Sequence, residues 1–178
     1  MRLRTKLAAT AAASAMVVLA AAAPAFADGT AGTQTVTATD AQAVSVTIGT
    51  SSVDFDNLSP ASAASTIDAG TVQVQSNAGY SLSVADLGGL SNATPSFLAD
   101  PLQISETLTS GTGTPGQAEA TAIDTTEGTP GPGLTVGTDD AAGTDVYDIS
   151  LTQAATWQDA PGSDYTDTLT YTASAGTV

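Results

Sequence analysis

The sequence predicts an all-β protein, an antiparallel, immunoglobulin-like β-sandwich of about seven to nine short strands. Three observations favour this class. Apolar and polar residues alternate in several short segments, most clearly at residues 147–151 and 168–173, which is the pattern of strands with one buried face. Residues that favour turns separate these segments at intervals of roughly 8–12 residues. After residue 27, no segment shows the repeat of about 3.6 residues that an amphipathic helix requires.

The start of the chain has the composition of a secretory signal peptide, which we expect to occupy residues 1–27. Three basic residues lie within residues 2–6, an Ala-rich apolar run occupies residues 7–23, and Ala-Phe-Ala at residues 25–27 fits a cleavage site. The run falls short of the ~20 strongly apolar residues that a membrane-spanning helix needs. We therefore expect a secreted protein with no membrane span once the signal peptide is removed.

The rest of the chain is long enough for one domain. Residues 28–35 are small and polar and are expected to form a flexible N-terminus. Residues 36–178 are expected to form a single β-sandwich. Within it, residues 109–144 are rich in Gly, Pro and Thr and are interpreted as a loop region, with short strands at 118–123 and 134–136 as the alternative.

The other strands are predicted from alternation. Residues 67–85 are interpreted as a β-hairpin whose turn is Ser-Asn-Ala-Gly at 76–79. A loop that contains Trp157, the only tryptophan, joins the last two predicted strands. The remaining predicted strands lie, in order, at residues 44–48, 52–56, 102–106, 145–152 and 166–173, with a separate short strand at residues 35–39 as an alternative.

The charge of the chain excludes several partners. It has 18 acidic and 3 basic residues, and all three basic residues lie in the predicted signal peptide, so the mature chain has no positively charged side chain. Such a surface repels phosphate groups, so we expect neither nucleic acid nor anionic membranes as partners. Metal ions and basic patches on other proteins are the natural counterparts. Because cysteine is absent, the core must hold the domain without disulfides.

The residue types of the mature chain also exclude most catalytic chemistry. Without His, Cys, Lys or Arg, it cannot form a Ser-His-Asp or Cys-His site, a Schiff base, an arginine clamp or a His/Cys zinc site. Carboxylate chemistry remains, but no spacing singles out a pair of the glycosidase type. We therefore expect no enzymatic activity and no cofactor, with calcium as the one alternative.

Calcium is the metal that an exported, acidic chain favours, because it binds carboxylate and carbonyl oxygens. No segment matches the D-x-[DN]-x-[DN]-G calcium loop. Solvated aspartates in turns and on outer strand faces are the other interpretation. The candidate ligands are Asp139, Asp140, Asp145 and Asp148, with Asp54, Asp56 and Asn57 as a second group.

The loop around the tryptophan is the candidate ligand-binding segment. An indole can stack on a sugar ring, so Trp157, together with Asp159 and Tyr165, is a candidate carbohydrate-binding group. The sequence offers no second clustered aromatic to complete such a site. Trp157 is therefore interpreted first as a packing residue that caps the sandwich.

Three segments carry a resemblance to known proteins. Residues 72–84 (VQVQSNAGYSLSV), 155–161 (ATWQDAP) and 164–174 (DYTDTLTYTAS) resemble small Thr- and Ala-rich exported bacterial sandwiches, of the WxL-type cell-surface and spore coat protein U-like kinds. Trp157 is followed by Gln-Asp and not by the x-Leu of the WxL motif, so the peptidoglycan-binding role of that family is not carried over. The resemblance implies a structural or surface role and assigns no site residues.

These observations predict a non-enzymatic exported protein that is secreted or held at the cell surface and acts as a structural or interaction protein. Its expected partners are other cell-envelope or surface proteins, or copies of itself. The alternative is a secreted calcium- or carbohydrate-binding module with cell-wall glycan as its ligand.

Overall fold

The computed structural model describes residues 35–86, 88–92, 96–124, 131–162 and 164–176. The predicted signal peptide and almost all of the predicted flexible N-terminus lie outside these ranges. Every strand belongs to one compact unit, Thr39–Val178. Among the described residues, no helix has the length and apolar character needed to cross a membrane.

The described residues form nine strands. Their bounds are β1 Val44–Ile48, β2 Ser65–Ser76, β3 Tyr80–Ala85, β4 Gln103–Ser110, β5 Thr114–Pro115, β6 Thr121–Ala122, β7 Leu134–Asp139, β8 Gly143–Gln153 and β9 Thr170–Ala175.

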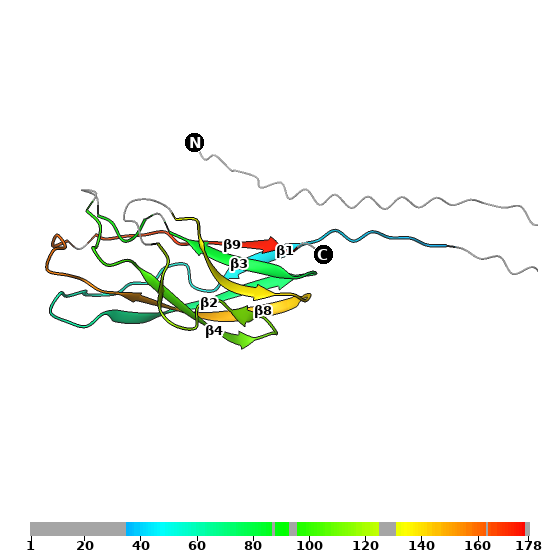
Figure 1. Cartoon of the computed structure of the whole chain (residues 1–178), viewed down its shortest axis with the longest axis horizontal. Helices are drawn as coiled ribbons and strands as arrows, with labels where there is room; N and C mark the ends of the chain where they lie inside the picture. Colours follow the sequence, from blue (N-terminus) through cyan, green and yellow to red (C-terminus); the bar gives the residue numbers. More distant parts are fainter. Residues whose placement is uncertain (1–34, 87, 93–95, 125–130, 163, 177–178) are drawn as a thin grey trace, which may run out of the picture. The chain divides into compact units, whose positions relative to one another are not determined.

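Two antiparallel sheets pack face to face, which confirms the predicted all-β sandwich. Sheet A has the strand order β1-β2-β8-β4-β6, and sheet B has the order β5-β7-β3-β9. Figure 1 shows the layer that contains β3 and β9 above the layer that contains β2, β8 and β4.

The core lies between the sheets because alternate residues of each long strand point inward. In β8, every second residue from Asp145 to Gln153 is buried. Burial of one Val, Leu or Ile side chain contributes about 1.5–3 kcal/mol. The buried apolar residues are Val72, Val74, Ile104, Tyr147, Ile149 and Leu151 from sheet A, and Tyr80, Leu82, Val84 and Val136 from sheet B.

The predicted hairpin at residues 67–85 is wrong in its pairing. β2 lies in sheet A and β3 lies in sheet B, so the turn at residues 76–79 carries the chain from one sheet to the other. β2 pairs with β8 along its length, from Ser65↔Gln153 to Ser76↔Gly143. In the same way, β8 and β9 are joined by the Trp157 loop but belong to opposite sheets.

The predicted strand at residues 52–56 is not formed, and neither is the alternative strand at residues 35–39. Residues 35–39 and 52–56 take part in no strand of the described chain. Phe55 is half-buried against the core, as the alternation predicted, but Asp56 has φ of 55°. That left-handed conformation is incompatible with a strand that continues through Asp56. The regular edge of sheet A ends earlier, with β1 at Ile48.

The interpretation of residues 109–144 as a loop region is only partly right. Outside residues 125–130, which the structure does not describe, this region contains β5, β6 and β7. β7 is an inner strand of sheet B, paired with both β3 and β5. Its Gly137 packs on Tyr147, and a β-carbon there would lie 2.7 Å from the Tyr147 Cζ atom. This glycine therefore serves close packing between the sheets.

Candidate functional site

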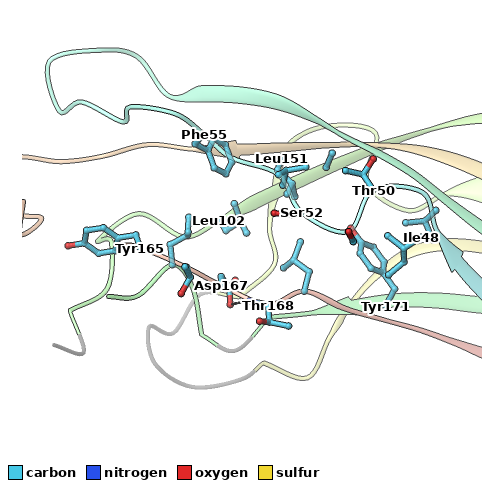
Figure 2. Close-up of a pocket in the computed structure, with 17 residues that line it drawn as sticks. Ile48, Thr50, Ser52, Phe55, Leu102, Leu151, Tyr165, Asp167, Thr168 and Tyr171 are labelled. Atoms are coloured by element: carbon cyan, nitrogen blue, oxygen red, sulfur yellow. Dashed lines mark hydrogen bonds between the residues drawn. The ribbon is translucent and has the colours of Figure 1, made fainter. Parts of the chain in front are cut away.

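A cleft of about 440 Å³ opens between the two sheets on the side formed by β1 and β9 (Figure 2). It exists because regular strands do not close that side along its whole length. β1 stops at Ile48, and β9 does not begin until Thr170. Irregular segments line the cleft in their place, residues 50–53 after β1 and residues 165–169 before β9.

The base of the cleft is the hydrophobic core itself. Val72, Leu102 and Leu151 are buried core residues, and each has atoms that line the cleft. The half-buried Leu169 and Tyr171 complete the apolar lining on the side of sheet B. Burial raises the pKa of the Tyr171 hydroxyl to about 12. An apolar group that enters the cleft would therefore contact the core directly.

The cleft is longer than it is wide. Figure 2 shows Tyr165 at one end and Ile48 at the other. Phe55 lies along one long side, while Asp167 and Thr168 lie along the opposite side. This outline suits an extended chain better than a compact ligand.

One carboxylate lies in the wall of the cleft, and three more are next in sequence to residues that line it. Asp167 is half-buried in its wall. Asp54 and Asp56 are exposed on either side of Phe55, and Asp164 is exposed immediately before Tyr165. The three basic residues of the chain all lie within residues 2–6, so no Lys, Arg or His in the described part of the chain neutralises this charge.

The two sides of the sandwich differ in how their edges are protected. β5 and β6 form the edges on one side, are two residues long, and include Pro115, which has no N–H to offer. β1 and β9 form the edges beside the cleft, with five and six residues and neither a charge nor a proline. Long, uncharged edges can add a further strand. The side with the cleft is therefore the side open to association.

The predicted ligand-binding residues do not form one site. Trp157 is 81% exposed, so its interpretation as a packing residue was wrong. It lies on a tight turn in which the Asp159 N–H donates to the Thr156 carbonyl at 3.2 Å. The Asp159 carboxylate accepts from the N–H groups of Ala99 at 2.8 Å and Thr156 at 2.5 Å. Asp159 thus fixes the turn that holds Trp157 in solvent.

Tyr165 is the one member of that group that lines the cleft. Its hydroxyl donates to the Ala160 carbonyl at 2.7 Å, which ties the end of the Trp157 loop to the cleft wall. The sequence predicted the right loop for Tyr165 but gave no indication of the cleft beside it.

The four aspartates predicted to bind calcium do not form one group, although the side chains of Asp139 and Asp145 lie close enough to interact. Asp145 is buried and Asp148 is exposed, because they occupy odd and even positions of β8 and point to opposite faces. Asp139 and Asp140 lie at the end of β7 and in the following turn. Among the described residues, no group of three or more His, Cys, Asp or Glu side chains is arranged to hold a metal ion.

Asp145 instead anchors a buried network. Its Oδ2 accepts from the Tyr80 hydroxyl at 2.7 Å, and its Oδ1 accepts from the N–H groups of Thr112 at 2.8 Å and Gly113 at 2.9 Å. The hydroxyls of Tyr80 and Tyr147 lie 2.7 Å apart. Burial is the main cause that raises the pKa of both tyrosines. This network therefore joins the two sheets.

Glu106 is a second buried carboxyl group, only 1% exposed. Its Oε1 accepts from the Gln117 N–H, while its Oε2 has no hydrogen-bond partner in the described chain. Burial raises its pKa to about 7, against the opposing effect of the N–H groups of Gln117 and Gly116. Sequence reasoning missed Glu106, although it occupies the inward position between Ile104 and Leu108 in an alternating strand.

A third buried carboxyl group lies close to the cleft. Asp86 is 3% exposed and accepts from the Gly88 N–H at 3.0 Å. Burial is the largest cause that raises its pKa, and the charges of Asp167 and Asp124 raise it further. The negative charge of Asp167 in the cleft wall thus acts on a carboxyl group inside the protein.

Comparison of the chain with protein-family models, curated proteins and solved structures finds no match. The resemblance to WxL-type and spore coat protein U-like proteins stays a prediction, and the function is argued from the site alone.

Proposed function

We propose that this chain is a non-enzymatic, exported protein of the cell surface that binds a partner protein along the open side of its sandwich. The observation that carries the proposal is the apolar cleft of about 440 Å³ beside the ends of two uncharged edge strands, β1 and β9. The predicted signal peptide supports export. The role is that of a structural or interaction protein at the cell envelope.

The energetics of the cleft support binding of a polypeptide. A bulky apolar side chain placed on Val72, Leu102 and Leu151 would gain about 1.5–3 kcal/mol from burial. Each hydrogen bond between its backbone and a strand edge adds about 0.5–1.5 kcal/mol. A small number of such contacts is enough for a specific, reversible complex.

The functional groups of the cleft favour binding over catalysis. Of its lining side chains, Asp167 alone is a carboxylate, and the wall facing it carries the hydroxyls of Thr50, Ser51 and Ser52. Hydrolysis of a glycoside would need a second carboxyl group across the cleft. The Tyr165 hydroxyl already donates to a backbone carbonyl.

The proposal is tested by blocking the cleft in the native host. Ser52 is exposed and lines the cleft, so Ser52→Trp places a large side chain at its mouth without disturbing the core. Ser81 is exposed on β3 and does not line the cleft, so Ser81→Trp is the matched control. We expect Ser52→Trp to move the protein from the cell-surface fraction to the medium and Ser81→Trp to leave it in place. Equal surface retention of both variants would refute the proposal.

A carbohydrate-binding role is the second candidate, and one observation favours it. Trp157 is 81% exposed on a turn that Asp159 fixes in place, so its indole is accessible to stack on a sugar ring. Titration with fragments of cell-wall glycan should change the fluorescence of this single tryptophan. A spectrum that stays constant up to millimolar glycan would remove this candidate.

A further inference from the structure

We infer that the segment bound by the cleft is an extended, basic stretch of a partner protein, with one bulky apolar residue flanked on both sides by Lys or Arg. This inference rests on the proposed function and adds the chemistry of the partner. Three features carry it: the charge of the mouth, the outline of the cleft and the periodicity of an extended chain.

The charge of the mouth selects a cationic partner. Asp54, Asp56 and Asp164 are exposed, and each is adjacent in sequence to a residue that lines the cleft, while Asp167 is half-buried in the wall. The chain has a formal net charge of −15 and no basic residue beyond position 6. A second copy of the domain would bring the same uncompensated negative charge to the interface, where like charges oppose association. A basic segment brings the missing cations.

Acidic residues belong to the chain segments on both long sides of the cleft. Phe55, whose sequence neighbours are Asp54 and Asp56, lies on one side in Figure 2, and Asp167 lies on the other. A chain that runs along the cleft from Tyr165 towards Ile48 therefore passes between Asp167 on one side and the segment of Phe55, with its acidic sequence neighbours, on the other.

The periodicity of an extended chain sets the spacing of the partner's residues. Side chains two positions apart point to the same face and lie about 6–7 Å apart. When an apolar residue points into the cleft, basic residues two positions before and after it point to the same side and reach the mouth. The partner motif is therefore basic-x-apolar-x-basic, where the apolar residue is large.

The exposed hydroxyl groups along the cleft suit the backbone of such a segment. Ser51 and Ser52 on one side and Thr166 and Thr168 on the other are exposed and line the cleft. Hydroxyl groups donate and accept, so they can satisfy the N–H and C=O groups of an extended chain that lies over them. They add no charge that would compete with the carboxylates.

Three synthetic peptides test the inference on the purified protein. The peptide TKTFTKT carries the proposed motif, TETFTET reverses its charge, and TKTSTKT removes its apolar side chain. We expect TKTFTKT to bind, the other two to bind at least about tenfold more weakly, and the affinity of TKTFTKT to fall as salt is raised. Equal binding of TETFTET and TKTFTKT, or no binding of TKTFTKT, overturns the inference.

Two triple variants of the protein test whether the carboxylates next to the cleft attract the peptide. The triple variant Asp54→Asn, Asp56→Asn, Asp164→Asn removes three charges at the mouth, and Asn tolerates the positive φ at position 56. The control Glu119→Gln, Asp140→Asn, Asp148→Asn removes three charges from exposed positions that do not line the cleft. We expect the mouth variant to bind TKTFTKT about tenfold more weakly and the control to bind within about twofold of the unchanged protein.

The outcomes separate this inference from the proposed function. Equal weakening in both triple variants would mean that net charge alone attracts the peptide, and the inference of a local site would be wrong. If no peptide binds but Ser52→Trp still releases the protein from the cell surface, the cleft binds a partner of other chemistry. If Ser52→Trp has no effect on retention, the proposed function itself fails.

Discussion

The hydroxyl groups of Tyr80 and Tyr147 lie 2.7 Å apart and connect the two sheets of the sandwich inside its core. Tyr80 belongs to β3 of sheet B, and Tyr147 belongs to β8 of sheet A. Tyr80 donates its hydrogen to Asp145, so its oxygen accepts from Tyr147. The chain has no cysteine, so hydrogen bonds, and not a disulfide, make this specific contact between the sheets.

Replacement of Asp145 tests how much this network contributes to the free energy of unfolding. In Asp145→Asn, one acceptor oxygen becomes an NH₂ group that faces the hydrogen-bonded pair of tyrosine hydroxyls. Loss of a buried hydrogen bond that leaves polar groups unsatisfied costs about 1–3 kcal/mol. We expect urea unfolding to show a decrease of this size in the free energy of unfolding. Asp148→Asn, on the exposed face of the same strand, should change it by less than about 0.5 kcal/mol. Equal effects of the two substitutions would contradict the role given to Asp145.

Glu106 should make the stability depend on pH. Its pKa is raised by burial from 4.5 to about 7, so the folded state binds more protons than the unfolded state between these values. The free energy of unfolding must then fall as the pH rises through this range, by about 3 kcal/mol in total.

Glu106→Gln removes this contribution. Relative to the unchanged protein, the variant should gain stability as the pH rises from about 4.5 to about 7, and the difference should stay constant above and below that range. Asp86, whose pKa is also raised, remains in both proteins and cancels in the comparison. Urea unfolding across this pH range measures the difference. A difference that does not vary with pH would show that Glu106 titrates normally in the folded state.

Gly137 is expected to tolerate no side chain. A β-carbon at this position would lie 2.7 Å from Cζ and 2.9 Å from the hydroxyl oxygen of Tyr147, so Gly137→Ala should destabilise the fold by about 1–3 kcal/mol through overpacking. Gly143 at the start of β8 has no atom within 4 Å of the corresponding position. Gly143→Ala should therefore leave the thermal midpoint unchanged or raise it slightly. If Gly137→Ala leaves the stability unchanged, β7 and β8 pack more loosely than described.

Trp157 should contribute almost nothing to stability. It is 81% exposed, so Trp157→Ala is expected to change the free energy of unfolding by less than about 0.5 kcal/mol. The fluorescence of the folded protein should be quenched by acrylamide nearly as strongly as that of the unfolded chain. A loss of about 3–5 kcal/mol, as for a buried tryptophan, would restore the interpretation of Trp157 as a packing residue.

The strands could be predicted from the sequence, but their partners could not. Alternation identified β1 at residues 44–48 and the inward-facing residues of β8 because one face of each strand is buried. It could not show that β2 and β3 lie in different sheets, because the period of two is the same whichever strand lies alongside. The loop interpretation of residues 109–144 failed at β7, where the alternative strand at 134–136 was right, because composition does not distinguish a glycine in a turn from Gly137, which packs on Tyr147 within a strand.

The cleft could not be predicted, although part of its chemistry could. Its position depends on the ends of β1 and β9 and on the left-handed backbone at Asp56, which the alternation of residues 52–56 conceals. The attraction of this region for cations could be predicted, because the sequence places Asp54, Asp56 and Asn57 together as a candidate calcium-binding group. The buried Glu106 could also have been recognised from its inward position in β4.

A site-specific cross-link in the cleft tests the central claim most directly. A photoreactive amino acid can replace Thr168, which is exposed and lines the cleft, or Ser81, which is exposed on β3 and does not. After irradiation of intact host cells, mass spectrometry identifies the cross-linked residues of the partner. We predict that position 168 joins a polypeptide segment with the basic-x-apolar-x-basic motif and that position 81 does not. Cross-links to the same partner segment from both positions, or from position 81 alone, would contradict the assignment of the cleft as the binding site.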